Sequence, residues 1–235
     1  PIPLGGKVDF VWYIEIAPGE SMVQVVALDS RKGGLSDYQI ELSQVSRFGF
    51  SDIEGHWAAA PINELARRDA LNGYEDGTFR PGQLITRSEI ACILDNLITW
   101  STDSTSAANQ SGFKDASQIP AWALNAVTLV RAQGLIQGYP DGTFKPQNLI
   151  TRGELAVLTV RMLEKAGWDG RTKTGAQSPV SINLAQIPSW CRSAVKQNVE
   201  LGIMNGREEG RFEPEQSATR AEVATVFYRL LSVLE

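Results

Sequence analysis

Histidine and cysteine are almost absent from this sequence. His56 is the only histidine, and Cys92 and Cys191 are the two cysteines. A Ser-His-Asp triad is not credible with this one histidine, which we expect to lie exposed at a helix start, and a metal site of histidine and cysteine has no ligand set. Two buried free thiols are favoured over a disulfide between the cysteines. The sequence therefore predicts no catalytic centre, no metal and no cofactor.

Long apolar runs and an excess of positive charge are also missing. No run approaches the ~20 residues that cross a bilayer, so we expect no membrane insertion. The net charge of -5 argues against binding to nucleic acid or to an acidic membrane. Basic residues outnumber acidic ones in 112–167, so any anion-binding surface is expected to involve that segment. The chain begins with Pro1 and shows no signal peptide, which leads us to expect a mature form or an excised fragment.

A segment that occurs three times dominates the sequence. It begins at a tryptophan, passes through a glycine-containing turn and F-x-P, and ends in T-R-x-E. Its copies run from Trp57 to Glu89, from Trp122 to Glu154 and, more loosely, from Trp190 to Glu222. A nearly constant spacing maps each copy onto the next without a gap inside the unit. Such a period indicates one supersecondary unit used three times, here over residues 47–104, 111–168 and 178–235, with polar linkers between them.

Each repeat is predicted to contain two helices, one near the tryptophan and one starting at T-R-x-E. Ile90, Ile93, Leu94 and Leu97 form one apolar stripe at helical spacing. The helix after Thr151 is apolar nearly all round and should be the most enclosed. Because a single helix pair cannot bury its stripe alone, we predict a mainly α, pseudo-threefold domain of six helices with the T-R-x-E helices at its centre. A linear solenoid is the competing arrangement.

The first 46 residues have a different character. Segments 8–16, 21–28 and 37–42 are rich in β-branched and aromatic residues and are separated by turn residues, which predicts three strands. Three strands alone make a poor core. The region weakly resembles the last hairpin of bacterial cadherin-like sandwich domains, and it is either the end of such a spacer or a hairpin docked on the repeats.

The T-R-x-E motif has the form of a helix capping box. In such a box, the threonine hydroxyl accepts from the amide three residues later, and the glutamate reaches back to the threonine amide. This structural role explains both residue types and is favoured over a role of the glutamates as glycosidase-like acids. The predicted capping residues are Thr86, Glu89, Thr151, Glu154, Thr219 and Glu222.

The arginine of the motif is not explained by helix formation. Arg87, Arg152 and Arg220 fall at the first helical position, where the helix dipole disfavours a cation by roughly 0.3–1 kcal/mol. An arginine beside free N–H groups at a helix start forms a strong site for a carboxylate or phosphate. The alternatives are an ion pair with Asp76 or Asp141 of the preceding turn, or a bond to a carbonyl of the neighbouring repeat.

Other repeated residues allow both structural and binding roles. Gly77 and Gly142 follow aspartates in turns and are interpreted as mainly fold-forming. The tryptophans at the start of the first helices are expected to be core residues more often than platforms for a sugar ring. Asp52 and Asp115 lie just ahead of those helices, where they either cap the helix or bond a ligand hydroxyl.

Taken together, F-x-D, W-A, G-Y-x-D-G-T-F-x-P and I-T-R-x-E resemble the S-layer homology (SLH) repeat of bacterial surface proteins. The resemblance implies a three-pronged spindle whose grooves bind secondary cell wall polysaccharide or a related peptidoglycan-linked glycan, typically at a pyruvylated N-acetylmannosamine end. It implies a secreted anchor of the bacterial cell surface that is monomeric as a module and not an enzyme, with the arginine facing the acidic ketal. The candidate glycan-binding residues are Arg87, Arg152, Arg220, Asp52, Asp115, Trp57, Trp122, Gly77 and Gly142.

Two repeats depart from the family pattern. In the first, Asp69 stands where the family usually has glycine. In the third, Ser181 and Asn183 stand where Phe and Asp would align, and residues 207–212 replace Y-x-D-G-T-F with a segment whose two consecutive glutamates would repel an acidic ketal. We therefore expect the grooves built around the first two repeats to work and one that relies on the third repeat's turn to be weak.

These expectations lead to a test and to three possible parent proteins. Substituting a working arginine by alanine is expected to cost roughly 1.5–3 kcal/mol of binding and little stability. The module belongs to a wall-anchored protein, to the targeting tail of a polysaccharide-degrading enzyme, or to an S-layer subunit that acts through protein contacts.

Overall fold

The computed structural model describes residues 26–28, 35–37, 49–98, 112–168, 182–207 and 210–235. The chain divides into two compact units, residues 1–46 and 47–235. In the first unit, β1 (Val26–Leu28) and β2 (Leu35–Asp37) pair in antiparallel register. β1 falls inside the predicted strand 21–28, and β2 begins two residues before the predicted strand 37–42. The predicted strand 8–16 lies outside the described residues.

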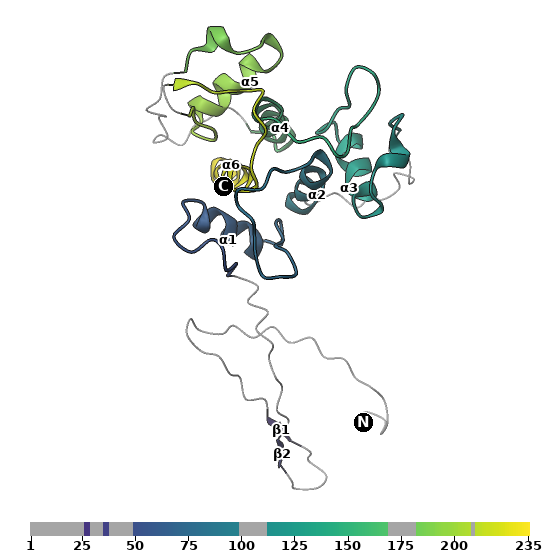
Figure 1. Ribbon diagram of the computed structural model, residues 1–235, viewed down its shortest axis with the longest axis vertical. Coiled ribbons are helices and arrows are strands. Elements are labelled where there is room, and N and C mark those ends of the chain that lie inside the picture. Colours follow the sequence, from purple (N-terminus) through teal and green to yellow (C-terminus); the bar gives the residue numbers. More distant parts are fainter. Residues whose placement is uncertain (1–25, 29–34, 38–48, 99–111, 169–181, 208–209) are drawn as a thin grey trace. The chain divides into compact units, whose positions relative to one another are not determined.

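The second unit contains two helices from each repeat among its described residues. The first helices are α1 (Ala59–Arg67), α3 (Ala121–Ala132) and α5 (Ser189–Glu200). The second helices are α2 (Arg87–Leu97), α4 (Arg152–Lys165) and α6 (Arg220–Leu234). Short 3-10 turns, Ala116–Gln118 and Leu184–Gln186, precede α3 and α5. Figure 1 shows α2, α4 and α6 around the centre of three lobes, which confirms the predicted mainly helical arrangement.

The helices pack across repeat boundaries and not within a repeat. α2 packs on α3, α4 packs on α5, and α6 packs on α1, so each lobe joins the second helix of one repeat to the first helix of another. The two helices predicted for each repeat are present, and each packs on a helix of another repeat. The α6–α1 contact closes the ring, which excludes the linear solenoid. At this closure Arg68 Nη1 lies 2.7 Å from Glu235 Oε1.

A continuous apolar core fills the unit. The phenylalanines of the three F-x-P turns, Phe79, Phe144 and Phe212, are fully buried. Ile62 and Leu65 of α1 are fully buried as well. Eight residues of α4 are buried, and so are eight of α6. The predicted enclosure of α4 is therefore close to that of α6, with eight of 14 residues buried against eight of 15, and Val157 and Val160 on its outer side are half-buried.

The two cysteines are free thiols. Cys191 is buried, and Cys92 is half-buried, with burial raising the pKa of the Cys92 thiol to about 11. His56, expected to be exposed, is half-buried, and its Nδ1 accepts a hydrogen bond from the Ala58 amide at 3.1 Å. None of the helices in the described segments has the length and apolarity needed to cross a membrane.

Candidate functional site

The three repeats meet where the central helices begin. The first two amides of each central helix donate to carbonyls of another repeat, as Arg87 N does to Asn148 O at 2.9 Å and Ser88 N to Pro146 O at 3.2 Å. The equivalent bonds join Arg152 to Gln216, Gly153 to Pro214, Arg220 to Gln83 and Ala221 to Pro81. These amides are not free, so the sequence argument for an anion site made by the helix N-terminus is wrong at all three helices.

The predicted capping boxes are confirmed at α2, α4 and α6. Each threonine side chain accepts from the amide of the glutamate three residues later, and the glutamate side chain accepts from the threonine amide. In α4 the Thr151 amide donates to Glu154 Oε2 at 2.9 Å. Because the cap uses Oε2, the other carboxylate oxygen remains available to a second partner.

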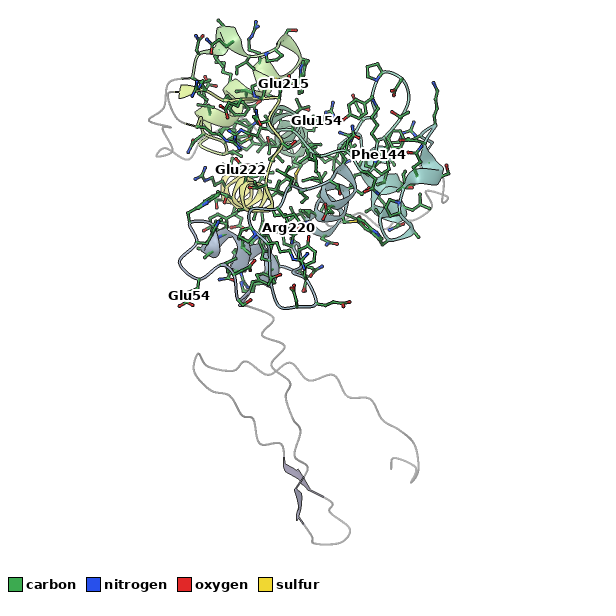
Figure 2. The ribbon with its side chains drawn as sticks, viewed as in Figure 1. Glu54, Phe144, Glu154, Glu215, Arg220 and Glu222 are labelled. Carbon is green, nitrogen blue, oxygen red and sulfur yellow. The ribbon has the colours of Figure 1, made fainter. Side chains whose placement is uncertain are left out.

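That second partner is the arginine of the preceding repeat. Arg87 Nη1 lies 2.9 Å from Glu154 Oε1, and Arg87 Nε donates to Phe144 O at 2.8 Å. Arg87 is only 5% exposed. The same arrangement links Arg152 to Glu222 at 3.0 Å and to Phe212 O at 2.9 Å, and Arg220 to Phe79 O at 2.9 Å and, more loosely, to Glu89 at 3.9 Å. Figure 2 places Glu154, Glu222 and Arg220 toward the middle of the unit, where the lobes meet, and Glu54 at its outer end.

Of the alternatives considered for the arginine, the structure supports a hydrogen bond to a carbonyl of the neighbouring repeat. It adds an ion pair with the motif glutamate of that repeat, which the sequence did not suggest. Asp76 and Asp141 pair instead with Arg80 and Lys145 of their own turns. Each buried arginine ties two repeats together, and its removal leaves a buried carbonyl and a glutamate without their partner. We therefore expect alanine at these positions to cost stability, in contrast to the expectation from the sequence.

Asp115 holds a strained turn. Its two carboxylate oxygens accept from the Phe144 and Lys145 amides at 2.7 and 2.8 Å. Lys145 has a φ of 55°, in the left-handed region that a non-glycine residue seldom occupies. Asp52 makes the equivalent bonds to Phe79 and Arg80, both at 2.7 Å. Neither aspartate caps the first helix, because the side chains at the starts of α1 and α3 make no capping bond.

Gly77 and Gly142 serve the turn conformation. Their φ angles are 78° and 83°, which glycine adopts without a steric penalty. Beside Gly142, the Asp141 side chain accepts from the Thr143 hydroxyl and amide at 2.6 and 2.9 Å. Hydrogen bonds from Thr143 lower the pKa of Asp141 to about 2. This geometry agrees with the fold-forming interpretation of both glycines.

The three repeated tryptophans are on the surface. Trp57 is 63% exposed, Trp122 62% and Trp190 51%, so the prediction that they are core residues is wrong. They lie at or just before the first turn of α1, α3 and α5, outside the packed stripe. The Trp190 ring lies against the start of α4, since a Cβ on Gly153 would be 2.8 Å from its Cη2.

A cavity of about 530 Å³ opens beside Arg87 and Trp190. Its walls come from the turn 136–140, from 148–151 and from the outer face of α4, including Glu154, Val157 and Arg161. Tyr139 contributes its hydroxyl, which donates to Glu154 Oε1 at 2.9 Å, and its ring, which lies 4.6 Å from the Arg87 guanidinium carbon. The cavity therefore combines cationic, acidic, aromatic and hydrogen-bonding groups from three repeats, with Glu154 and Glu215 as the acidic ones.

Of the predicted glycan-binding residues, this cavity includes Arg87. Asp52, Asp115, Gly77 and Gly142 support turns, and Trp57 and Trp122 belong to other lobes. Sequence reasoning missed Tyr139, Arg161 and Trp190 as cavity residues. A signal existed for α4: a helix that is apolar on all sides has an outer face that either packs or lines a pocket.

Comparison with known proteins matches three segments of the chain to the S-layer homology domain. The matched residues are 49–91, 112–156 and 184–224. Each match begins before the first helix of a repeat and ends within its second helix, so it contains the F-x-P turn and the T-R-x-E motif. The matched segments together make up more than half of the chain.

Several relatives are surface proteins or enzymes. The chain is 33% identical over 168 residues to cell surface glycoprotein 1 of Acetivibrio thermocellus, over 70% of this chain and 7% of that protein. It is 35% identical over 143 residues to a cellulosome-anchoring protein of the same organism, over 58% of this chain and 30% of that protein. It is 30% identical over 209 residues to an amylopullulanase of Thermoanaerobacterium thermosulfurigenes, over 87% of this chain and 11% of that enzyme. The chain thus spans less than a third of each of these relatives.

S-layer homology domains anchor surface proteins and enzymes to the cell wall, which places this module at the cell surface. The closed threefold arrangement explains why three copies occur together, since each copy supplies contacts that the next one requires. With three matched repeats, the chain belongs to the S-layer homology domain family.

Proposed function

We propose that this chain is a non-catalytic module that holds its parent protein to the cell wall by binding an acidic, pyruvylated secondary cell wall polysaccharide between the repeats. The observation that carries the proposal is the cavity beside Arg87, which lies between repeats and is lined by Tyr139, Arg161 and Trp190. Its volume of about 530 Å³ is in the range of roughly 300–1,000 Å³ usual for small-ligand sites.

The Arg87 guanidinium has a donor to offer to a ligand acid. Its Nε and Nη1 are engaged at 2.8 and 2.9 Å, but Nη2 lies 3.5 Å from Gln137 O, at the limit of a hydrogen bond. A carboxylate in the cavity would accept from Nη2 more strongly than that carbonyl does, because the bond would be charge-assisted. A pyruvate ketal supplies such a carboxylate.

The sugar ring has its own surface beside this donor. Trp190 is 51% exposed and lines the cavity, and the Tyr139 ring lies beside the Arg87 guanidinium. Flat aromatic faces suit the apolar face of a pyranose, while Asn148 and Gln137 provide polar groups for its hydroxyls. By the repetition of the fold, Trp57 and Trp122 occupy the equivalent positions beside Arg152 and Arg220.

Calorimetric titration with pyruvylated N-acetylmannosamine tests the proposal, with unmodified N-acetylmannosamine as the matched ligand. We expect the pyruvylated sugar to bind and the unmodified sugar to bind at least tenfold more weakly, because it lacks the acid. Trp190→Ala should weaken the binding of both sugars. Absence of binding by the wild-type chain to the pyruvylated sugar and to purified wall polysaccharide would refute the glycan anchor.

Protein variants must separate binding from folding. Arg87→Ala should reduce affinity by about tenfold to a hundredfold, but it also removes contacts between repeats, so its thermal unfolding has to be measured beside it. Arg67→Ala is the matched control, because Arg67 lies on α1 with its side chain 61% exposed and pairs with Glu64. Equal losses in the two variants would show that Arg87 has no direct role.

The enzyme-tail alternative is favoured by particular relatives. The chain matches an exoglucanase of Acetivibrio thermocellus over 16% of that protein, at 31% identity, as well as the amylopullulanase. A tail of this kind would bind the wall through the same cavity, and the rest of the parent sequence would distinguish it. An S-layer subunit that acts through protein contacts differs: its retention on purified cell wall would not depend on Trp190.

A further inference from the structure

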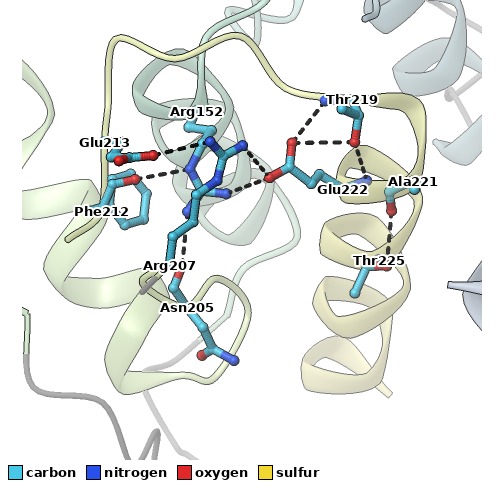
Figure 3. Close-up of polar contacts among 9 residues, drawn as sticks. All are labelled: Arg152, Asn205, Arg207, Phe212, Glu213, Thr219, Ala221, Glu222 and Thr225. Carbon is cyan, nitrogen blue, oxygen red and sulfur yellow. Dashed lines mark hydrogen bonds and ion pairs between the residues drawn. The ribbon is translucent and has the colours of Figure 1, made fainter. Parts of the chain in front are cut away.

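The third repeat replaces the tyrosine of the glycine turn with an arginine. Arg207 occupies the position that Tyr74 and Tyr139 hold in the other repeats. Its Nη2 donates to Glu222 Oε1 at 2.8 Å, as the Tyr139 hydroxyl donates to Glu154 Oε1 at 2.9 Å. Figure 3 shows Arg207 and Arg152 converging on Glu222. We call the region formed by Arg152, Asn205, Arg207, Phe212 and Glu222 the Arg152 junction.

Each of the three guanidinium nitrogens of Arg152 donates a close hydrogen bond at this junction. Its Nε donates to Phe212 O at 2.9 Å, Nη1 to Glu222 Oε1 at 3.0 Å and Nη2 to Asn205 O at 2.8 Å. The other two arginines each keep one loose contact. Arg87 Nη2 is 3.5 Å from Gln137 O, and Arg220 Nη1 is 3.9 Å from Glu89 Oε1. Arg152 is thus the one of the three motif arginines whose guanidinium nitrogens all have close protein acceptors.

The charges at the Arg152 junction are also balanced internally. Arg207 pairs with Glu222 through Nη2 and with Glu213 through Nη1, at 2.8 and 3.1 Å. Burial opposes ionisation of Glu222, but the hydrogen bonds from Arg207 and from the Thr219 amide lower its pKa. Among the described residues, two guanidinium groups thus face two carboxylates, which is one ion pair more than at the Arg87 position, where Arg87 pairs with Glu154. Tyr139 is neutral and adds no such pair beside Arg87.

We infer that Arg207 closes the Arg152 junction to acidic sugars, so that the protein binds pyruvylated glycan at the Arg87 and Arg220 positions and not at the Arg152 position. The inference rests on the proposed function, and it assigns Arg207 as the residue that sets which positions accept the ligand. The replaced tyrosine explains the difference: an arginine at this position donates the same bond to the glutamate and brings a charge that a second carboxylate, Glu213, then neutralises.

The exposed tryptophans allow each position to be observed separately. Trp190 lines the Arg87 cavity. From the repetition of the fold we expect Trp57 to lie beside Arg152 and Trp122 beside Arg220. Indole ¹⁵N–¹H NMR signals, assigned with single Trp→Phe variants, can be followed while pyruvylated N-acetylmannosamine is added. The Trp190 and Trp122 indoles should shift with saturation, and the Trp57 indole should not. Calorimetry should give two sites per chain.

Arg207→Tyr should open the Arg152 junction to the ligand. We expect the Trp57 indole to begin to shift and the stoichiometry to rise from two to three, whereas Arg67→Tyr, an exposed control, should leave both unchanged. Arg207→Gln, which removes the charge but keeps a donor, should also open it if the tyrosine variant folds poorly. A Trp57 shift in the wild type, or an unchanged stoichiometry in both folded Arg207 variants, would overturn the inference alone. A wild type in which no indole shifts would overturn the proposed function with it.

Discussion

Replacing Asp115 by alanine should destabilise the repeat domain by breaking the clamp on its second turn. Asp115 is 8% exposed, and its two oxygens accept from the buried Phe144 amide at 2.7 Å and from the Lys145 amide at 2.8 Å. The alanine side chain offers these amides no acceptor in place of the carboxylate. The clamp also holds Lys145 at a φ of 55°, so its loss releases a residue that prefers another conformation.

The size of the effect follows from these two bonds. A hydrogen bond to a charged group contributes about 1.5–3 kcal/mol, and a buried donor left without an acceptor costs about 1–3 kcal/mol. The Lys145 amide is only partly buried and regains water, whereas the Phe144 amide does not. We therefore expect Asp115→Ala to lower the free energy of unfolding by about 2–4 kcal/mol.

Urea unfolding of the full chain, followed by helical circular dichroism at neutral pH, measures this change. Asn183→Ala is the matched control, because Asn183 holds the equivalent position in the third repeat and accepts from the nearby Ala185 amide, at 3.1 Å, instead of clamping a turn. It should cost less than about 1 kcal/mol. Equal losses in the two variants, or a loss below about 1 kcal/mol for Asp115→Ala, would refute the clamp.

Three further tests address the backbone and the ion pairs. Asp69 has a φ of 55° where the other repeats have Gly134 and Gly202. Asp69→Gly should therefore raise the free energy of unfolding by up to about 1 kcal/mol, as measured by urea unfolding. Gly134→Ala places a Cβ that meets no atom within 4 Å, so its cost of about 1 kcal/mol should come from the positive φ alone. Gly138→Ala would place a Cβ 2.6 Å from the Thr143 carbonyl oxygen and should lower the melting temperature, whereas Gly82→Ala meets no atom within 4 Å and should not. The pKa of Glu222 in the folded protein lies below its ordinary value of 4.5. The contribution of Glu222 to stability is therefore complete above pH 4.5 and is lost as the pH falls through the folded pKa. Glu222→Gln should be less stable than the wild type at pH 7 and should lose less stability on acidification.

The sequence predicted the elements whose causes are local. A capping box involves residues three apart, so the starts of α2, α4 and α6 could be placed from Thr, Arg and Glu alone. The turn aspartates and glycines were likewise interpretable, because positive φ is a property of single residues. The repetition itself indicated a closed set of helices, and the structure confirmed the closure.

The candidate site was less predictable because its contacts join different repeats. The arginine pattern was found, and a carbonyl of the neighbouring repeat was among its possible partners, but the glutamate was not: Arg87 contacts Phe144 O and Glu154, which lie more than fifty residues away. The tryptophans were misinterpreted because a tryptophan at a helix start has the same sequence signature whether it is buried or exposed. Tyr139 and Arg161 carry no pattern of their own, and only the cavity identifies them.

By itself, the sequence determined three repeats, their helix starts, their turns and their membership of one family, since each depends on residues close together in the chain. The tertiary structure alone decided that α2 pairs with α3, α4 with α5 and α6 with α1, that each motif glutamate serves both a cap and a neighbour's arginine, and that a cavity opens beside Arg87. These features depend on how apolar stripes close around an axis. That closure brings together charges and rings whose separation along the chain gives no sign of their contact.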